Sequence, residues 1–126
     1  MKHEAFVHHV RDRAGLGSAQ DAEVAIAATL KTFGERLQPF TAAMVASHLP
    51  PDIGRYLDDH AHHSELSINQ FYDLVAQREN RAVDDAKVHA ECVLETLCEA
   101  LAYAEVLKLR QHLPPDFRAL LHFAAA

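Results

Sequence analysis

Three histidines within four residues, His60, His62 and His63, form the strongest chemical signal in the chain. Neutral imidazole is a common ligand of zinc, nickel and copper, and the carboxylate of Glu65 stands nearby in the sequence. The alternative is a solvated connection that tolerates histidine, because a metal site usually draws its ligands from separate elements. We expect no resident cofactor and keep a zinc or nickel site at these three histidines as the alternative.

A His-Leu-Pro-Pro-Asp segment occurs twice and places a histidine four residues before an aspartate. The pairs are His48 with Asp52 and His112 with Asp116, and either could do acid–base chemistry within hydrogen-bond reach. Proline also ends a helix, and aspartate favours the start of the next one. We favour a helix corner, because a shared fold is enough to keep such a corner in both places.

Two further groupings suggest chemistry. His89 lies one helical turn before Cys92, which could bind a metal or activate a thiolate, although a buried histidine beside a small apolar cysteine is favoured. Glu4, His8 and Asp12 share one helix face, where mild surface pairing is favoured. The sequence contains no Glu-x-x-His, glycine-rich phosphate loop or Gly-x-Ser-x-Gly motif. We therefore expect no catalytic residues and a protein that is not an enzyme.

The elements that carry these residues are repeated. Residues 22–57 align without gaps on residues 86–121, with twelve identities in 36 positions. Upstream the match continues, at an offset of 65 rather than 64, for Phe6 on Phe71 and Val10 on Val75. This self-similarity indicates an internal duplication. Its expected parts are repeat 1 at about 4–57, a connector at about 58–66 and repeat 2 at about 67–121.

Each half has the apolar spacing of helices, and no alternating run is long enough for a strand. In the first half, Ser18 precedes a stripe that ends at Leu37, and serine accepts hydrogen bonds from the first amides of a helix. Pro39 suits the first turn of the next helix, and Pro50 ends it. A short fourth helix follows each Pro-Pro segment, and in the second half it carries Phe117, Leu120 and Leu121.

The sequence therefore predicts an all-α fold. Two homologous units of three to four helices should pack about a pseudo-two-fold axis into one compact helical domain, residues 1–126. A single unit has too small a hydrophobic core to be stable alone, so we expect the two units to bury their apolar faces against each other.

These features resemble the bacterial family known as domain of unknown function 2267. The motifs are a Phe-x-x-x-Val helix, an alanine-rich helix with Ala-x-x-x-Ala-x-x-x-Leu spacing, and Leu-Pro-Pro-Asp, and they cover about residues 4–121. Their residues in the first half are Phe6, Val10, Ala22, Leu30, Leu37, Leu49, Pro50, Pro51 and Asp52. In the second half they are Phe71, Val75, Ala86, Leu94, Leu101, Leu113, Pro114 and Asp116. The resemblance implies a small, soluble, all-helical bacterial protein and no particular activity.

The net charge of the chain disfavours some classes of binding partner. The formal net charge is −6 with neutral histidine, whereas a groove for nucleic acid needs a surplus of cations. With 10 histidines, the charge is unusually sensitive to pH between about 5 and 7, and pH sensing is a further alternative. We expect a non-enzymatic module that binds another protein or itself, as a possible homodimer, with no nucleic acid. Exposed apolar residues such as Tyr56, Tyr103 or Phe123 would mark the interface.

The cysteines and the lengths of the apolar runs indicate the cellular compartment. Cys92 and Cys98 lie six apart in one predicted helix and point about 120° apart, a geometry that disfavours a disulfide and fits a reducing compartment. The first residues lack the apolar run of a signal peptide, and no stretch reaches the length of a membrane span. We expect a cytoplasmic protein with no membrane contact.

Overall fold

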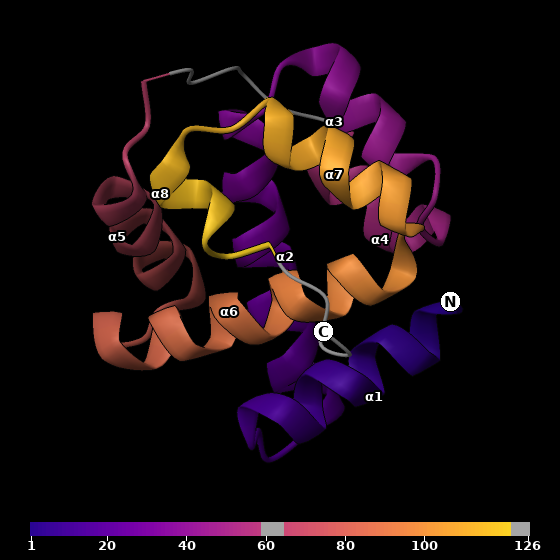
Figure 1. Ribbon diagram of the computed structural model, residues 1–126. Coiled ribbons are helices and arrows are strands. Elements are labelled where there is room, and N and C mark those ends of the chain that lie inside the picture. Colours follow the sequence, from indigo (N-terminus) through magenta and orange to yellow (C-terminus); the bar gives the residue numbers. More distant parts are fainter. Residues whose placement is uncertain (59–64, 122–126) are drawn as a thin grey trace.

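The computed structural model describes residues 1–58 and 65–121, and these ranges contain helices and no strands (Figure 1). The prediction of an all-α fold is confirmed. The helices, in chain order, are α1 (His3–Ala14), α2 (Ala19–Arg36), α3 (Pro39–Ala46), α4 (Pro51–Asp58), α5 (Ile68–Glu79), α6 (Val83–Ala100), α7 (Tyr103–Gln111) and α8 (Pro115–Arg118). None of them is long and apolar enough to cross a lipid bilayer.

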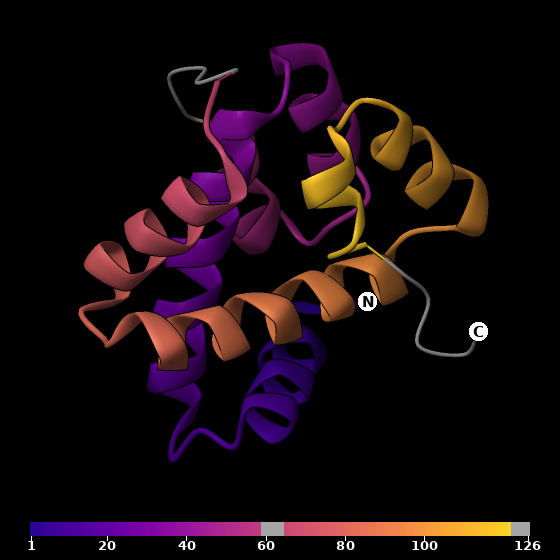
Figure 2. The same ribbon diagram turned by 60° about the vertical axis from the view of Figure 1, so that its left-hand side comes forward.

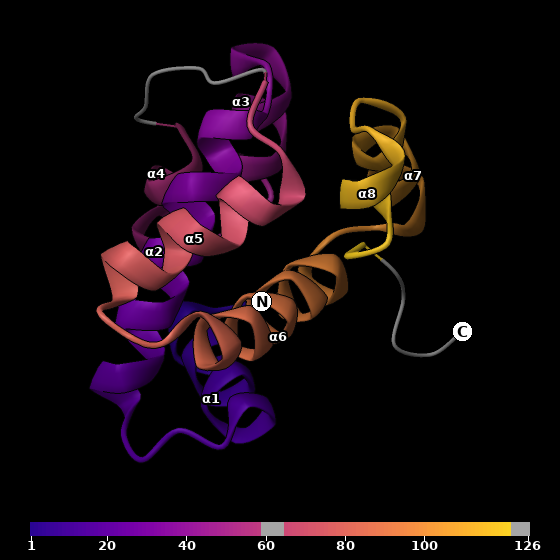
Figure 3. The same cartoon turned by 90° about the vertical axis from the view of Figure 1, so that its left-hand side faces the viewer.

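The two 18-residue helices, α2 and α6, pack against each other at the centre of the molecule. The shorter helices α1 and α5 each contact both of them (Figure 2). Helices α3 and α4 follow the end of α2, and α7 and α8 follow the end of α6 (Figure 3). The four helices α1, α2, α5 and α6 therefore form a central bundle, and each half of the chain supplies two of them.

Local sequence signals begin and end several helices, but α3 ends at Ala46 and so stops before Pro50. The Ser18 hydroxyl accepts a hydrogen bond of 3.1 Å from the backbone N–H of Asp21 and caps α2. Ser67 and Gln70 form a complete capping box at the start of α5. Gly15 ends α1 with φ +65°, a left-handed conformation that glycine adopts without a steric cost.

The predicted apolar stripes form the core. In the first half, the buried stripe residues are Phe6, Val7, Val10, Ala22, Ala25, Ile26, Thr29, Leu30, Phe33, Leu37, Ala42, Val45 and Leu49. In the second half they are Phe71, Tyr72, Val75, Ala86, Ala90, Val93, Leu94, Leu97, Leu101, Val106, Leu109, Leu113, Phe117 and Leu121. Ala14, Ile68 and Leu120 are only partly buried. Helical periodicity was therefore sufficient to identify most of the buried face of each helix.

A contact between an arginine and a buried glutamate joins the two halves. Arg78 on α5 reaches α2, where it donates to the Thr32 hydroxyl at 2.9 Å and pairs with the Glu35 carboxylate at 2.9 Å. Glu35 is only 5% exposed, so its charge needs a cation within the protein. The Thr32 hydroxyl itself donates to the Ala28 carbonyl at 2.7 Å, which fixes its orientation.

An equivalent contact runs from the first half of the chain to the second. Arg13 on α1 reaches α6, where it donates to the Thr96 hydroxyl at 2.9 Å and pairs with Glu99. The hydrogen bond to Glu99 raises the pKa of the Arg13 guanidinium above its usual range. Each half thus extends an arginine from its first helix to a threonine and a glutamate on the long helix of the other half.

The last helices of the two halves differ. An added Cβ at Gly34 would lie 2.9 Å from Leu57 Cα, and one at Gly54 would lie 2.7 Å from the Ala46 carbonyl oxygen. These two glycines let α4 pack backbone to backbone against α2 and α3.

The equivalent positions in the second half are occupied by side chains. Cys98 and Arg118 lie 64 residues after the two glycines, and α8 has four residues where α4 has eight. The prediction that Leu120 and Leu121 belong to this helix is wrong, because α8 ends at Arg118. Arg118 instead donates to the Leu113 carbonyl at 2.8 Å, against the end of α7.

We expect Gly34→Ala to lower the free energy of unfolding by about 2 to 3 kcal/mol, because the new methyl group overlaps the α4 backbone. Chemical denaturation with circular dichroism measures this. Gly17→Ala is the matched control, since its nearest non-neighbour atom would be 3.9 Å away, and we expect a change under about 1 kcal/mol. Equal stability of the two variants would show that α4 does not need this close approach.

Candidate functional site

In each His-Leu-Pro-Pro-Asp segment, one side chain contacts another helix. His48 Nε2 contacts the Glu105 carboxylate on α7, and not the aspartate four residues on. In the second segment, Asp116 Oδ2 accepts a hydrogen bond of 3.3 Å from the Ile68 backbone N–H, at the start of α5. His112 is the C-cap of α7. These residues therefore lie at helix ends, where His48 and Asp116 link one helix to another.

His89 is a buried histidine with a partner, as the sequence favoured. Its Nδ1 contacts Glu79 Oε2 on α5, and the two side chains are 8% and 2% exposed. The other carboxylate oxygen, Glu79 Oε1, is buried without a hydrogen-bond partner. The sequence missed this contact, because Glu79 comes from a neighbouring helix and not from the turn that carries Cys92.

Two histidines of α1 contact carboxylates at the surface. His8 Nε2 lies 3.0 Å from Asp12 Oδ2, and His3 Nε2 lies 2.7 Å from Glu23 on α2. Within residues 1–58 and 65–121, no group of three or more His, Cys, Asp or Glu side chains is arranged to hold a metal ion. The predicted ligands His60, His62 and His63 lie outside the residues that the structure describes.

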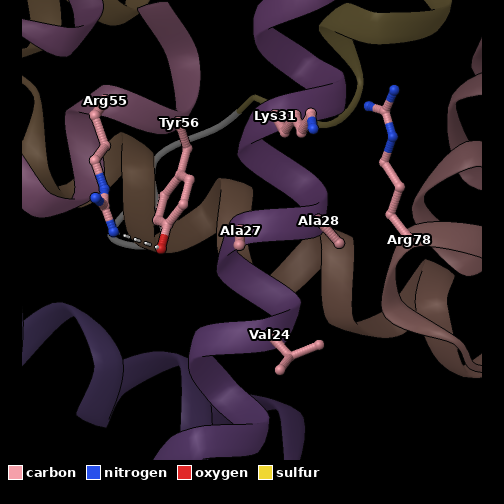
Figure 4. Close-up of a pocket in the computed structure, with 7 residues that line it drawn as sticks. All are labelled: Val24, Ala27, Ala28, Lys31, Arg55, Tyr56 and Arg78. Carbon is pink, nitrogen blue, oxygen red and sulfur yellow. Dashed lines mark hydrogen bonds between the residues drawn. The ribbon is translucent and has the colours of Figure 1, made fainter. Parts of the chain in front are cut away.

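Cationic side chains gather around a groove between α2, α4 and α5 (Figure 4). Its volume is about 520 Å³. We call it the cationic groove, and its lining consists of Val24, Ala27, Ala28, Lys31, Arg55, Tyr56 and Arg78. Three of these seven side chains carry a positive charge, although the chain as a whole is acidic.

Helix geometry and packing place these residues together. The four residues from α2 recur at helical spacing and so form one face of that helix. Their alanines are small, which leaves space above the helix. Gly34 brings α4 close enough for Arg55 and Tyr56 to border the same space, and the contacts to Thr32 and Glu35 hold Arg78 on the opposite side.

Arg55 and Tyr56 form one unit within the cationic groove. Arg55 Nη2 lies 3.4 Å from the Tyr56 hydroxyl oxygen, and its guanidinium carbon lies 5.1 Å from the ring centroid. The hydrogen bond to Tyr56 is the main cause that raises the pKa of Arg55 above its usual range. The guanidinium is solvent-exposed and positioned over an aromatic face, an arrangement that favours cation–π attraction.

Sequence reasoning found only one member of the groove, Tyr56, which was proposed as an interface residue. The cations come from three separate helices, so no local motif unites them. One signal was available in the alignment of the two halves, where Lys31 is aligned with Glu95 and Arg55 is aligned with Ala119. Of the other two proposed interface residues, Tyr103 is 64% exposed and Phe123 lies beyond the described chain. Phe40, at 83% exposed, was missed.

The fold and the groove together define a small all-helical protein with a charged surface site. Residues 3–120 match the family described as uncharacterized conserved protein (DUF2267), and the chain belongs to this family. The resemblance identified from the Phe-x-x-x-Val and Leu-Pro-Pro-Asp motifs is therefore confirmed. No curated protein sequence matches the chain.

We expect Cys92 to react slowly with iodoacetamide. Burial is the main cause that raises the pKa of its thiol, and the carboxylates of Glu95 and Glu91 raise it further. A raised pKa means less thiolate at a given pH, so the alkylation rate should increase only at a higher pH than for an ordinary cysteine.

Peptide mapping by mass spectrometry after timed alkylation measures the rate at Cys92 alone. Glu95→Gln removes one negative charge and should accelerate the reaction at a fixed pH. Alkylation of Cys92 as fast as that of free cysteine at pH 8 would contradict the expected direction.

Proposed function

We propose that the chain arose by duplication of a half-length unit, and that its halves pack about a pseudo-two-fold axis. Helices α2 and α6 have equal lengths and differ by 64 in residue number at both ends. Helices α1 and α5 also have equal lengths, with an offset of 65. The reciprocal contacts of Arg13 and Arg78 support the axis, because a two-fold operation exchanges one contact for the other.

We propose that this protein is a binding module and not an enzyme, and that the cationic groove binds acidic side chains of a protein partner. The observation that carries the proposal is the placement of Lys31 and Arg55 on one groove in a chain of net charge −6, beside Arg78, which is already paired with Glu35. Clustered like charges repel one another, so their placement around a groove suits an anionic partner.

The apolar part of the cationic groove favours a protein as that partner. Val24 is 42% exposed, and it lines the groove beside Ala27 and the Tyr56 ring. Aromatic and aliphatic side chains bordered by arginine are typical of protein–protein interfaces. Nucleic acid would need a longer track of cations than three side chains supply.

The side chains with the greatest catalytic potential have contacts that suit structural roles. His89 is buried against Glu79, Asp116 accepts from the start of α5, and burial raises the pKa of Cys92. These contacts support binding over catalysis. Cytoplasmic location stays a prediction, which rests on Cys92 and Cys98 remaining as thiols.

A fluorescein-labelled hexaglutamate peptide tests the cationic groove. We expect the wild-type protein to bind it, and we expect Lys31→Glu/Arg55→Glu to weaken binding at least about tenfold, because two attractive charges become repulsive. Fluorescence anisotropy at about 50 mM salt measures the affinity under conditions where screening is modest. Arg78 is left unchanged because it also stabilises the contact between α5 and α2.

The matched control is Lys108→Glu/Arg110→Glu, which makes the same change of charge on α7, away from the groove. It should lower the affinity much less, since only the long-range field changes. If the two double variants lose affinity equally, peptide binding follows net charge and the groove is not the site.

The alternative function is metal binding by His60, His62 and His63. It predicts stoichiometric zinc or nickel in untagged protein purified without a metal column, and loss of that metal when the three histidines are replaced by alanine. Elemental analysis of both proteins measures this. We expect the wild-type protein to contain less than about 0.1 metal ion per chain, since the three neighbouring ligands come from one segment. One ion per chain would favour the alternative.

A further inference from the structure

A second groove lies between α5, α6 and the segment that contains α8, with a volume of about 460 Å³. We call it the acidic groove. The residues that matter to its chemistry are Tyr72, Lys87, Glu91, Glu95, Asp116 and Leu120. Three carboxylates face one lysine, and Lys87 Nζ lies 5.3 Å from the centroid of the Tyr72 ring. The groove is therefore acidic overall.

The two grooves are equivalent in part. Each is lined by one long helix and by the short segment that follows its Pro-Pro pair, whereas α5 supplies the remaining side chains of both grooves. Glu95 lies 64 residues after Lys31, and Leu120 lies 64 residues after Tyr56. Equivalent positions on the long helices thus carry opposite charges. In the acidic groove, the pKa of Tyr72 is raised to about 12, mainly by burial and further by the nearby carboxylate of Glu91.

We infer that the cationic groove of one copy of this chain binds the acidic groove of a second copy. The inference rests on the proposed function, because it names the partner of the same site. Lys31 and Arg55 on one copy would face Glu91 and Glu95 on the next. The exposed Val24 in one groove and the partly buried Leu120 in the other would lose contact with water at the same time.

The contact joins two different surfaces, so it is heterologous. Such a contact generates a ring when the rotation closes and an open chain when it does not. Each exposed ion pair contributes little, on the order of 0.2 to 1 kcal/mol, and two chains of net charge −6 repel at long range. The association is therefore weak and needs a high protein concentration.

Sedimentation equilibrium at about 0.1 M salt tests the inference, since local contacts survive there while long-range repulsion is largely screened. We expect the wild-type protein to exceed the 14.0 kDa mass of one chain as its concentration rises. Lys31→Glu and Glu95→Lys should each weaken self-association at least tenfold. The lysine at position 95 should be tolerated, because Lys31 occupies the equivalent place in the first half.

The decisive experiment mixes the two variants. Glu95→Lys retains the cationic groove and Lys31→Glu retains the acidic groove, so an equimolar mixture should associate at least tenfold more strongly than either variant alone. Lys108→Glu and Glu4→Lys make the same charge changes elsewhere and should associate like the wild type. Circular dichroism of every variant shows whether the helices are retained.

Two outcomes overturn the inference. One is a wild-type protein that stays at the mass of one chain up to about millimolar concentration, where even weak contacts are populated. The other is a mixture that associates no more than its components, which would move any self-association to another surface, such as that around Phe40. In both cases binding of hexaglutamate by the wild-type protein would still support the cationic groove as a site for another protein.

Discussion

Burial of the two long helices governs the arrangement of everything else. Ten of the 18 residues of α2 are buried, and α6 is covered almost as fully, so the buried face of each is wider than the apolar stripe of an ordinary surface helix. Helix α2 is covered by α1, α4, α5 and α6 together. Because α5 and α6 belong to the second half, the first half cannot complete its own core. Arg13 and Arg78 then fix how the halves meet, since each pairs with a glutamate across the junction.

Small residues explain why the two ends of the molecule differ although their motifs agree. Gly34 and Gly54 remove the side chains that would separate α4 from its neighbours. Cys98 and Arg118 stand at the equivalent positions of the second half, where the last helix is short. The Pro-Pro-Asp segment begins a helix in both halves, but backbone contact allows a longer one only in the first.

The two halves differ in the charges that they carry at equivalent surface positions, and this difference bears on function. Most core positions keep their apolar character, whereas Lys31 and Glu95 carry opposite charges at equivalent points of α2 and α6. A solvent-exposed position tolerates such a change at little cost in stability. Two similar scaffolds can therefore present grooves of opposite charge without any change of fold.

The sequence alone determined the helices, their caps at Ser18 and Ser67, and the buried stripes, because periodicity, capping and proline effects depend on residues close together in the chain. Thr32 and Glu35 are identical to Thr96 and Glu99 at the offset of 64, but nothing in the sequence indicates that arginines bind them. The tertiary structure decided which helices cover α2 and α6, and so placed Glu79 against His89 and Glu105 against His48. It also brought Lys31, Arg55 and Arg78 around one groove. These contacts join residues between 10 and 57 positions apart, and only the crossing of packed helices sets such distances.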